Sequence, residues 1–394
     1  MTTAPRLHVR MSARRDDEEH RTATPFELLF DLVFVVAVAS LVGQAAHATV
    51  SGGLGPGLLA FPQVFFAIWW AWMNFTWFSS GYDTDDVLYR VLGTVQMAGV
   101  LILAAGVPGA FEHYDYATVT VGYVIMRIGL VALWVRAAIE HPETRAVSRR
   151  YAIGILIAQC LWVAKLLLIP TFHPVLVFAL LATFELLVPF WASRAGRDPW
   201  HPGHIAERYG LFVIILLGEG VLAATNGVQA ALAESGFTGQ LVAVGIAGLV
   251  ILVGLWWVYF LQPAAEGLAL HRRRGFYWGY GHYFLFAAVA AVGAGLEVAV
   301  QVVGGHAFVS PTAAGMVVAA PAALVLVLVW VLHSPLVATS EVPALAVFPA
   351  ALLMIGAALA APAIGVTGTL VAVAVLTAAV VAVTIGTRTA TRAG

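Results

Sequence analysis

Ionisable side chains inside long apolar runs are the residues of this sequence that could do chemistry. Arg127, Glu185, Glu219 and Glu297 each lie within such a run. Charged groups are costly inside a membrane, and those found there commonly mark substrate or ion pathways. Arg127 is too deep to reach the surface, so we expect it to pair with Glu185 or Glu219. A purely architectural ion pair is the alternative.

Two further acids begin the first apolar run. Glu27 and Asp31 are four residues apart, so both carboxylates lie on one face of a helix. Together with His204 and Arg208, at the start of a later run, they could gate an ion pathway. For Glu27 the alternative is a first-turn carboxylate that the helix dipole favours.

The start of that later run also holds possible metal ligands. His201, His204 and Glu207 follow one another at three-residue spacing, and two imidazoles with a carboxylate could bind zinc. A Pro-Gly pair interrupts a helix through His201, and the spacing is not that of the His-Glu-x-x-His metalloproteases. We therefore expect no metal and no cofactor, and keep these three residues only as candidates.

Two other charged features have competing interpretations. Asp83, Asp85 and Asp86 form an acidic cluster, which could hold a cation or simply bind water and pair with Arg90. Lys165, the only lysine, lies near the end of its apolar run. Its side chain could snorkel to the membrane surface or belong to a functional site inside the membrane.

These residues need membrane helices to position them. Apolar residues make up 61% of the 394 residues and charged residues 10%, whereas soluble domains carry about 25% charged residues. A bilayer is crossed by about 20 apolar residues in a helix, and twelve runs fit: 26–50, 58–80, 88–108, 116–138, 150–169, 174–194, 205–228, 239–262, 278–303, 313–333, 344–361 and 364–386. The sequence therefore predicts an all-α integral membrane protein with about twelve transmembrane helices.

The positions of the arginines predict the orientation. Lys and Arg accumulate in cytoplasmic loops. With twelve spans, the following arginines lie on the side of the N-terminus, and the opposite loops contain no Lys or Arg: Arg6, Arg10, Arg14, Arg15, Arg21, Arg90, Arg136, Arg145, Arg149, Arg150, Arg194, Arg197, Arg208, Arg272, Arg273, Arg274, Arg388 and Arg392. We expect a bacterial inner-membrane protein with cytoplasmic termini, residues 1–25 and 389–394 being the tails.

The chain also contains a possible internal repeat. Glu27 and Glu207 each precede an apolar run, and the pair Trp69 and Trp70 is matched by Trp256 and Trp257 in the second half. These similarities predict two parallel six-helix repeats, 26–197 and 198–388. Transporters of this layout place their site between the halves. Chance similarity between apolar helices is the alternative.

Three motifs, in order, resemble those of the bacterial low temperature requirement A family. They are ELLFDLVFV at 27–35, DTDD at 83–86 with Arg90, and the segment 199–219, which begins PWHPGHIAERYGLF. The resemblance implies a multi-pass membrane protein linked by name to growth in the cold, and it implies no known reaction. Gly220 stands where the family pattern predicts a serine, which weakens the case for a polar pair with Glu219.

Two main functions remain compatible with this sequence. The first is a proton- or ion-coupled transporter of unknown substrate. The alternative is a membrane-embedded enzyme that acts on lipid or isoprenoid substrates at the cytoplasmic edge, where the histidines and the acidic cluster lie. A sensor or scaffold is a third possibility. We expect membrane lipids and a small molecule or ion as partners and no nucleic acid, and an oligomer is compatible with the sequence.

Overall fold

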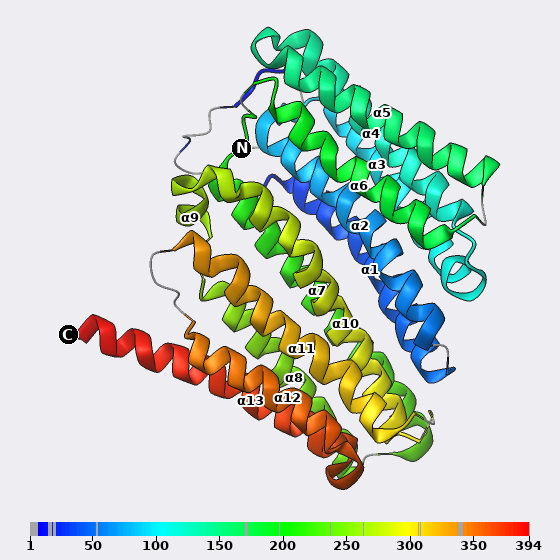
Figure 1. Cartoon of the computed structure of the whole chain (residues 1–394), viewed down its shortest axis with the longest axis vertical. Coiled ribbons are helices and arrows are strands. Elements are labelled where there is room, and N and C mark those ends of the chain that lie inside the picture. Colours follow the sequence, from blue (N-terminus) through cyan, green and yellow to red (C-terminus); the bar gives the residue numbers. More distant parts are fainter. Residues whose placement is uncertain are drawn as a thin grey trace. The chain divides into compact units, whose positions relative to one another are not determined.

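Helices are the secondary structure of the described part of the chain, and loops connect them. The computed structural model describes residues 7–14, 18, 21–52, 54–169, 172–196, 198–236, 238–262, 264–305, 307, 309–337 and 342–393, and these ranges contain no strand (Figure 1). Arg6, Arg15 and Arg197, which contributed to the predicted orientation, lie outside the described residues.

Each of the twelve predicted runs lies on a helix. The helices are α1 (Pro25–Val50), α2 (Leu54–Tyr82), α3 (Val87–His113), α4 (Ala117–Glu140), α5 (Arg145–Leu168), α6 (Pro174–Ser193), α7 (Pro202–Ser235), α8 (Gly239–Phe260), α10 (Gly275–Val303), α11 (Pro311–His333), α12 (Ala344–Leu359) and α13 (Ala361–Ala393). A short helix that was not predicted, α9 (Ala265–Leu270), follows α8.

Ten helices within the described residues are long and apolar enough to cross a membrane. The chain is therefore a multi-pass membrane protein. The sequence predicted about twelve crossings, and the two predicted spans outside this set of ten are α2 and α12. Helix α12 has 16 residues, fewer than the roughly 20 that a bilayer core requires.

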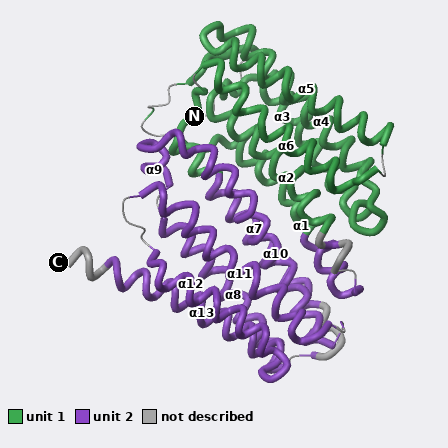
Figure 2. The backbone as a smooth tube through the Cα atoms, in the orientation of Figure 1, with its two compact units in different colours: residues 1–41, 59–208 green, residues 42–58, 209–394 purple. Residues whose placement is uncertain are grey.

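The helices form two compact units (Figure 2). Unit 1 comprises Met1–Leu41 and Leu59–Arg208, and unit 2 comprises Val42–Leu58 and Tyr209–Gly394. In unit 1, α4 packs between α3 and α5, and α5 packs against α6. In unit 2, α11 packs against α10, α12 and α13, and α13 packs against α8.

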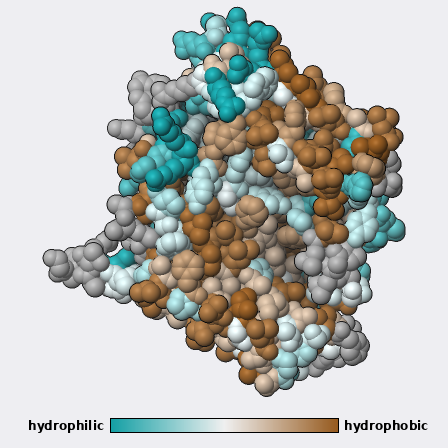
Figure 3. Space-filling view, viewed as in Figure 1, coloured by the Kyte–Doolittle hydropathy of each residue, from teal (hydrophilic) through white to brown (hydrophobic). Residues whose placement is uncertain are grey.

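Apolar side chains cover much of the outer surface of both units, as a lipid environment requires. Figure 3 shows this hydrophobic surface on one face, with hydrophilic residues gathered at the end of unit 1 where α4 and α5 are connected. In unit 1, Ile139 and Leu167 are 68% and 72% exposed. Leu352 is 76% exposed in unit 2. Lipid around side chains of this kind removes their apolar surface from water, which is favourable.

The two tryptophan pairs proposed as equivalent have different environments. Trp69 and Trp70 are buried in unit 1, whereas Trp256 and Trp257 are 41% and 43% exposed in unit 2. The two parallel six-helix repeats therefore stay a prediction.

Small residues bring α3 and α4 into close contact. A Cβ atom added to Gly122 of α4 would lie 2.4 Å from the backbone N of Leu103 and 2.6 Å from the backbone O of Gly99. Both helices therefore approach backbone to backbone at this point, which is how membrane helices gain packing energy in the absence of a hydrophobic driving force.

A side chain at Gly122 should separate these helices. We expect Gly122→Ala to lower the free energy of unfolding by about 1–3 kcal/mol or more, because the clash is with backbone rather than with a flexible side chain. The measurement is the melting temperature of the purified protein in detergent. Gly245→Ala in α8 is the matched control, since nothing lies within 4 Å of its added Cβ; an equal loss in both variants would contradict the prediction.

Candidate functional site

Four buried residues from α1 and α7 form one charge cluster in unit 1. Glu27 and Asp31 lie one turn apart on α1, and His204 and Arg208 lie one turn apart at the start of α7. All four are at most 1% exposed. We call Glu27, Asp31, His204 and Arg208 the charge cluster. From the sequence we expected these four residues to form one gate, and the structure places them in contact with one another.

Arg208 binds both carboxylates of the charge cluster. Its Nε donates to Asp31 Oδ2 at 2.9 Å and one terminal nitrogen donates to Asp31 Oδ1 at 2.5 Å. The other terminal nitrogen lies 2.9 Å from Glu27 Oε1. The planar guanidinium suits this two-pronged contact with Asp31. His204 Nε2 lies 3.1 Å from the same Glu27 oxygen.

Glu27 also caps the start of α1. Its Oε2 accepts from the backbone N–H of Thr24 at 2.9 Å, and the hydroxyl of Thr24 accepts from the Glu27 N–H at 3.2 Å. This reciprocal pair is a capping box, which satisfies backbone donors at a helix start. The two interpretations of Glu27 are therefore compatible, because one oxygen caps the helix and the other faces Arg208.

Helix α2 supplies a polar wall that the sequence did not reveal. Trp72 Nε1 donates to Asp31 Oδ1 at 2.7 Å, and Ser79 Oγ lies 3.5 Å from Arg208. Arg21 donates to the backbone carbonyls of Ser79 and Ser80. Trp72 was not predicted as a partner of Asp31; an indole N–H needs a partner when buried, and that need was the available signal.

The charge cluster contains more acid than base. Within the cluster two carboxylates face one guanidinium, and the nearby Arg21 and Asp83, whose charges act on Glu27, add one charge of each sign. Neutrality therefore requires one further proton, for example on the imidazole of His204. Among the described residues, His204 Nδ1 has no hydrogen-bond partner, whereas Nε2 lies against Glu27.

The three candidate metal ligands face different partners. His201 Nδ1 accepts from the backbone N–H of His204 at 3.1 Å, and its Nε2 lies 2.8 Å from the backbone O of Glu18. Glu207 accepts from the backbone N–H of Ala23 at 3.2 Å. His204 faces Glu27. In the ranges that the structure describes, no group of three His, Cys, Asp or Glu side chains could hold a metal ion.

The acidic cluster separates into three different contacts. Asp85 pairs with Arg90 at 2.7 Å. Asp86 caps α3 through the N–H of Tyr89 and binds Arg136 at 2.5 Å. Burial opposes the charge on Asp86, but hydrogen bonds from Arg136, and then from the backbone of Val9 and Tyr89, lower its pKa to about 2.

Asp83 has the most perturbed environment of the three. Its side chain is 4% exposed, and the nearest ion pair, with Arg14, is 3.6 Å long. Burial raises the pKa of Asp83 to about 6, and the nearby charge of Glu27 adds to this effect, whereas Arg21 and Arg14 oppose it.

Arg127 lies against Glu185 in a second buried site of unit 1. The two side chains are 2% and 4% exposed, and Arg127 lies 3.6 Å from Glu185 Oε2. Tyr123, one turn before Arg127, joins them: Arg127 donates to the Tyr123 hydroxyl at 2.7 Å, which donates to Glu185 at 2.5 Å. Trp162 Nε1 donates to the other Glu185 oxygen at 2.8 Å. The four-residue spacing of Tyr123 and Arg127 is the signal that could have indicated this bridge.

Glu219 belongs to unit 2, on α7. It is 5% exposed, and its Oε2 has no hydrogen-bond partner among the described residues. Gly220 next to it has a packing role, because an added Cβ would lie 3.5 Å from the Cα of Gly293 in α10 and 3.1 Å from Leu252. A close helix crossing therefore explains the glycine where the family pattern predicts serine.

Comparison with known proteins gives the family. Residues 22–381 match the family described as bacterial low temperature requirement A protein (LtrA). The chain belongs to the LtrA family. The resemblance found in the three sequence motifs is thereby confirmed, and the match includes all four residues of the charge cluster.

The chain is also similar to a curated bacterial protein. The chain is 28% identical to an uncharacterized protein of Rhizobium meliloti (strain 1021) over 257 residues, which are 63% of this chain and 60% of that protein. The alignment thus spans less than two thirds of the relative's length. No solved structure matches.

Loss of Arg208 should be far more damaging than loss of an exposed arginine. Arg208→Gln leaves two carboxylates buried without a cation, so we expect the free energy of unfolding to fall by about 3–5 kcal/mol. Arg90→Gln, which removes an ion pair about 40% exposed on each side, should cost at most about 1 kcal/mol. Thermal unfolding in detergent measures both. Equal stability of the two variants would contradict the structural importance of the charge cluster.

Asp83 should make stability depend on pH. Its pKa of about 6 in the folded protein is above the ordinary value of about 4, so the folded state binds the proton more tightly. Stability is therefore fully present below pH about 4 and falls as the pH rises through 6. Asp83→Asn should increase the free energy of unfolding at pH 7.5 by about 1–3 kcal/mol, with no gain at pH 4.

Melting temperatures of both proteins between pH 4 and 8 test this prediction. The matched control is Asp115→Asn, in the exposed turn between α3 and α4. A gain for Asp83→Asn that is the same at every pH would show that the carboxyl does not titrate in this range and would contradict the prediction.

Proposed function

We propose that this LtrA-family protein is a proton-coupled transporter, and that the charge cluster carries the coupling proton. The observation that supports this proposal is the imbalance of two buried carboxylates and one guanidinium beside a histidine. Burying an uncompensated charge costs several kcal/mol. The occluded cluster is consequently most stable with one bound proton.

His204 is the proton carrier in this proposal. Its Nδ1, which has no hydrogen-bond partner among the described residues, takes up the proton, and Nε2 keeps the contact with Glu27. The imidazolium then completes the neutralisation of Glu27 and Asp31. When the proton leaves, one negative charge remains buried. That state favours a conformation in which water or a cation reaches the cluster, and this difference couples the proton to a conformational change.

The remaining charged sites have separate roles in this proposal. The pair of Arg127 and Glu185 holds equal and opposite charges, and it lies on the substrate pathway rather than the proton pathway. Glu219 is a second candidate for a proton site in unit 2. Glu207 holds the segment before α1 through Ala23 and thereby shapes the entrance to the cluster.

The proposed topology completes this assignment. Twelve crossings, two parallel six-helix repeats (26–197 and 198–388) and cytoplasmic tails at both ends would place the charge cluster near the cytoplasmic face of a bacterial inner membrane. The alternative of a membrane enzyme rests on the same edge residues, of which His201, Asp85 and Asp86 have protein partners. For this reason we prefer the transporter.

Proton flux in proteoliposomes tests the proposal. Purified protein in liposomes with an internal pH-sensitive dye should carry protons under an imposed membrane potential, above the rate of empty liposomes. His204→Gln should lower this flux at least tenfold, because the proton-binding nitrogen is lost while the folded charge pairs remain. Glu219→Gln reports whether unit 2 contributes.

His113→Gln is the matched control, because this histidine is 73% exposed at the end of α3. It should carry protons at the wild-type rate. The proposal is wrong if wild-type protein is no faster than empty liposomes, or if neither His204→Gln nor Glu219→Gln changes the flux of a folded protein.

A further inference from the structure

A cavity in unit 1 contains the only lysine of the chain. It has a volume of about 50 Å³ and is lined by α2, α4, α5 and α6, with Lys165 on one wall. A single water needs roughly 10–15 Å³ of such space. The cavity therefore has room for about four waters or for a ligand with a few non-hydrogen atoms. It lies apart from the residues of the charge cluster.

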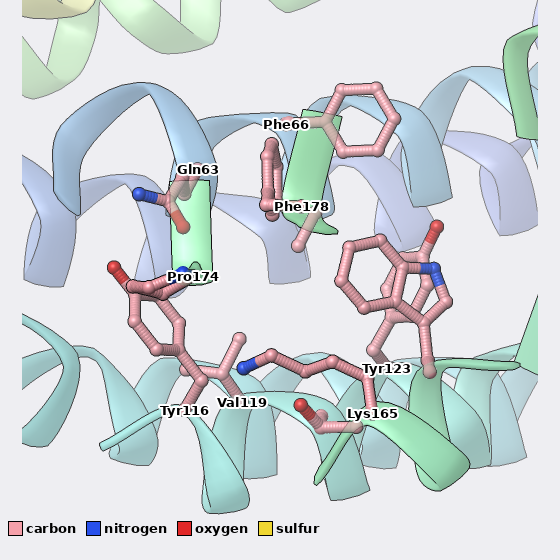
Figure 4. A pocket seen from close by; sticks show the side chains of 11 residues that line it. Gln63, Phe66, Tyr116, Val119, Tyr123, Lys165, Pro174 and Phe178 are labelled. Atoms are coloured by element: carbon pink, nitrogen blue, oxygen red, sulfur yellow. The ribbon is translucent and has the colours of Figure 1, made fainter. Parts of the chain in front are cut away.

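Aromatic rings form most of the cavity wall. Phe66 packs edge-on against Phe178 at 5.6 Å between ring centroids, and Phe178 lies 5.4 Å from Trp162. Trp162 in turn meets Tyr123 at 6.5 Å. These contacts hold the rings in place, so the apolar surface of the cavity is formed before any ligand enters. Figure 4 shows Phe66 and Phe178 on the side opposite Lys165.

The Lys165 ammonium is the cation of this cavity. The side chain extends along the cavity toward Tyr116 (Figure 4), with Nζ 5.8 Å from the centre of the Tyr116 ring. Among the described residues, no carboxylate pairs with it. The Tyr116 hydroxyl has no hydrogen-bond partner within the same ranges. A half-buried cation and a tyrosine hydroxyl on the walls of one aromatic pocket are suited to an anion with an apolar body.

We propose that this cavity binds a short-chain monocarboxylate anion. Its carboxylate contacts the Lys165 ammonium, with Tyr116 as a second donor. Its alkyl chain lies against Phe66, Phe178 and Trp162. The small volume selects about two to four carbons, and the single cation selects one negative charge.

Two side chains of the cavity wall also contact the buried pair of Arg127 and Glu185. Tyr123 and Trp162 line the cavity, and each also donates a hydrogen bond to Glu185. A ligand that moves either ring therefore changes the contacts of Glu185. A short-chain monocarboxylate would then be the substrate class of the proposed transporter. The transport of this anion rests on the proposed function, whereas its binding to the cavity does not.

Calorimetric titration of butyrate into the full-length protein tests the inference. The protein is held in nanodiscs of neutral phosphatidylcholine, and acetate, propionate and hexanoate are titrated for comparison. Butyrate should bind, and Lys165→Met should weaken it at least tenfold, about 1.4 kcal/mol. Lys165→Arg should stay within about threefold of wild type, because it keeps the charge. The neutral analogue butyramide should not bind.

Arg149→Gln is the matched control for the loss of one positive charge. Arg149 is exposed on the same helix, 16 residues before Lys165, which is about 24 Å along an α-helix. This variant should bind butyrate as the wild type does, and the melting temperatures of all variants show whether they are folded.

Three results would overturn the inference. Wild-type protein that binds none of the carboxylates rules it out, as does equal butyrate affinity in Lys165→Met. Anionic phospholipid retained through Lys165 in native mass spectrometry, and not displaced by butyrate, would make the cavity a lipid site instead. Butyrate binding without proton flux would leave this inference intact and remove the transport proposal, and flux without binding would do the opposite.

Discussion

The pairing of Arg208 with Glu27 and Asp31 is the interaction on which unit 1 depends most. One guanidinium joins the first turns of α1 to the first turns of α7, although the residues are 177 positions apart in the sequence. From α2, Trp72 donates to the Asp31 carboxylate and Ser79 lies against the Arg208 guanidinium. A lysine would supply the charge but not the planar fork of donors that reaches both acids. The charge cluster thus joins the starts of α1 and α7 to the second half of α2 at a single buried point.

Unit 1 contains two buried charged sites that differ in their charge balance. Arg127 and Glu185 cancel each other, and Tyr123, Trp162 and Gln159 satisfy the carboxylate. Such a site needs no mobile proton. The charge cluster has an additional carboxylate and a histidine nitrogen without a partner among the described residues, so its occupancy by a proton changes its electrostatic energy. This contrast is why we propose proton coupling at α1 and α7 and a binding role closer to α4 and α5.

The sequence predicted the helices well because their signal is local. Long apolar runs and the prolines and glycines between them locate all twelve long helices, and the spacing of Glu27 and Asp31 places both acids on one face. It did not predict which helix faces meet. Trp72, Tyr123 and Arg21 were missed as partners because their roles depend on side chains from distant helices. The three aspartates at 83–86 looked like one cluster, yet cations on different segments separate them.

The long separation between Arg208 and its two acids has a consequence for biosynthesis. Ribosomes add about 5–20 residues per second, so roughly 10–35 s pass between the synthesis of Asp31 and that of Arg208. During this interval the first helix carries two carboxylates whose cation does not yet exist. The burial of these acids against a cation can therefore be completed only after α7 has been made. The charge cluster thus links the packing of the first long helix to the synthesis of the seventh.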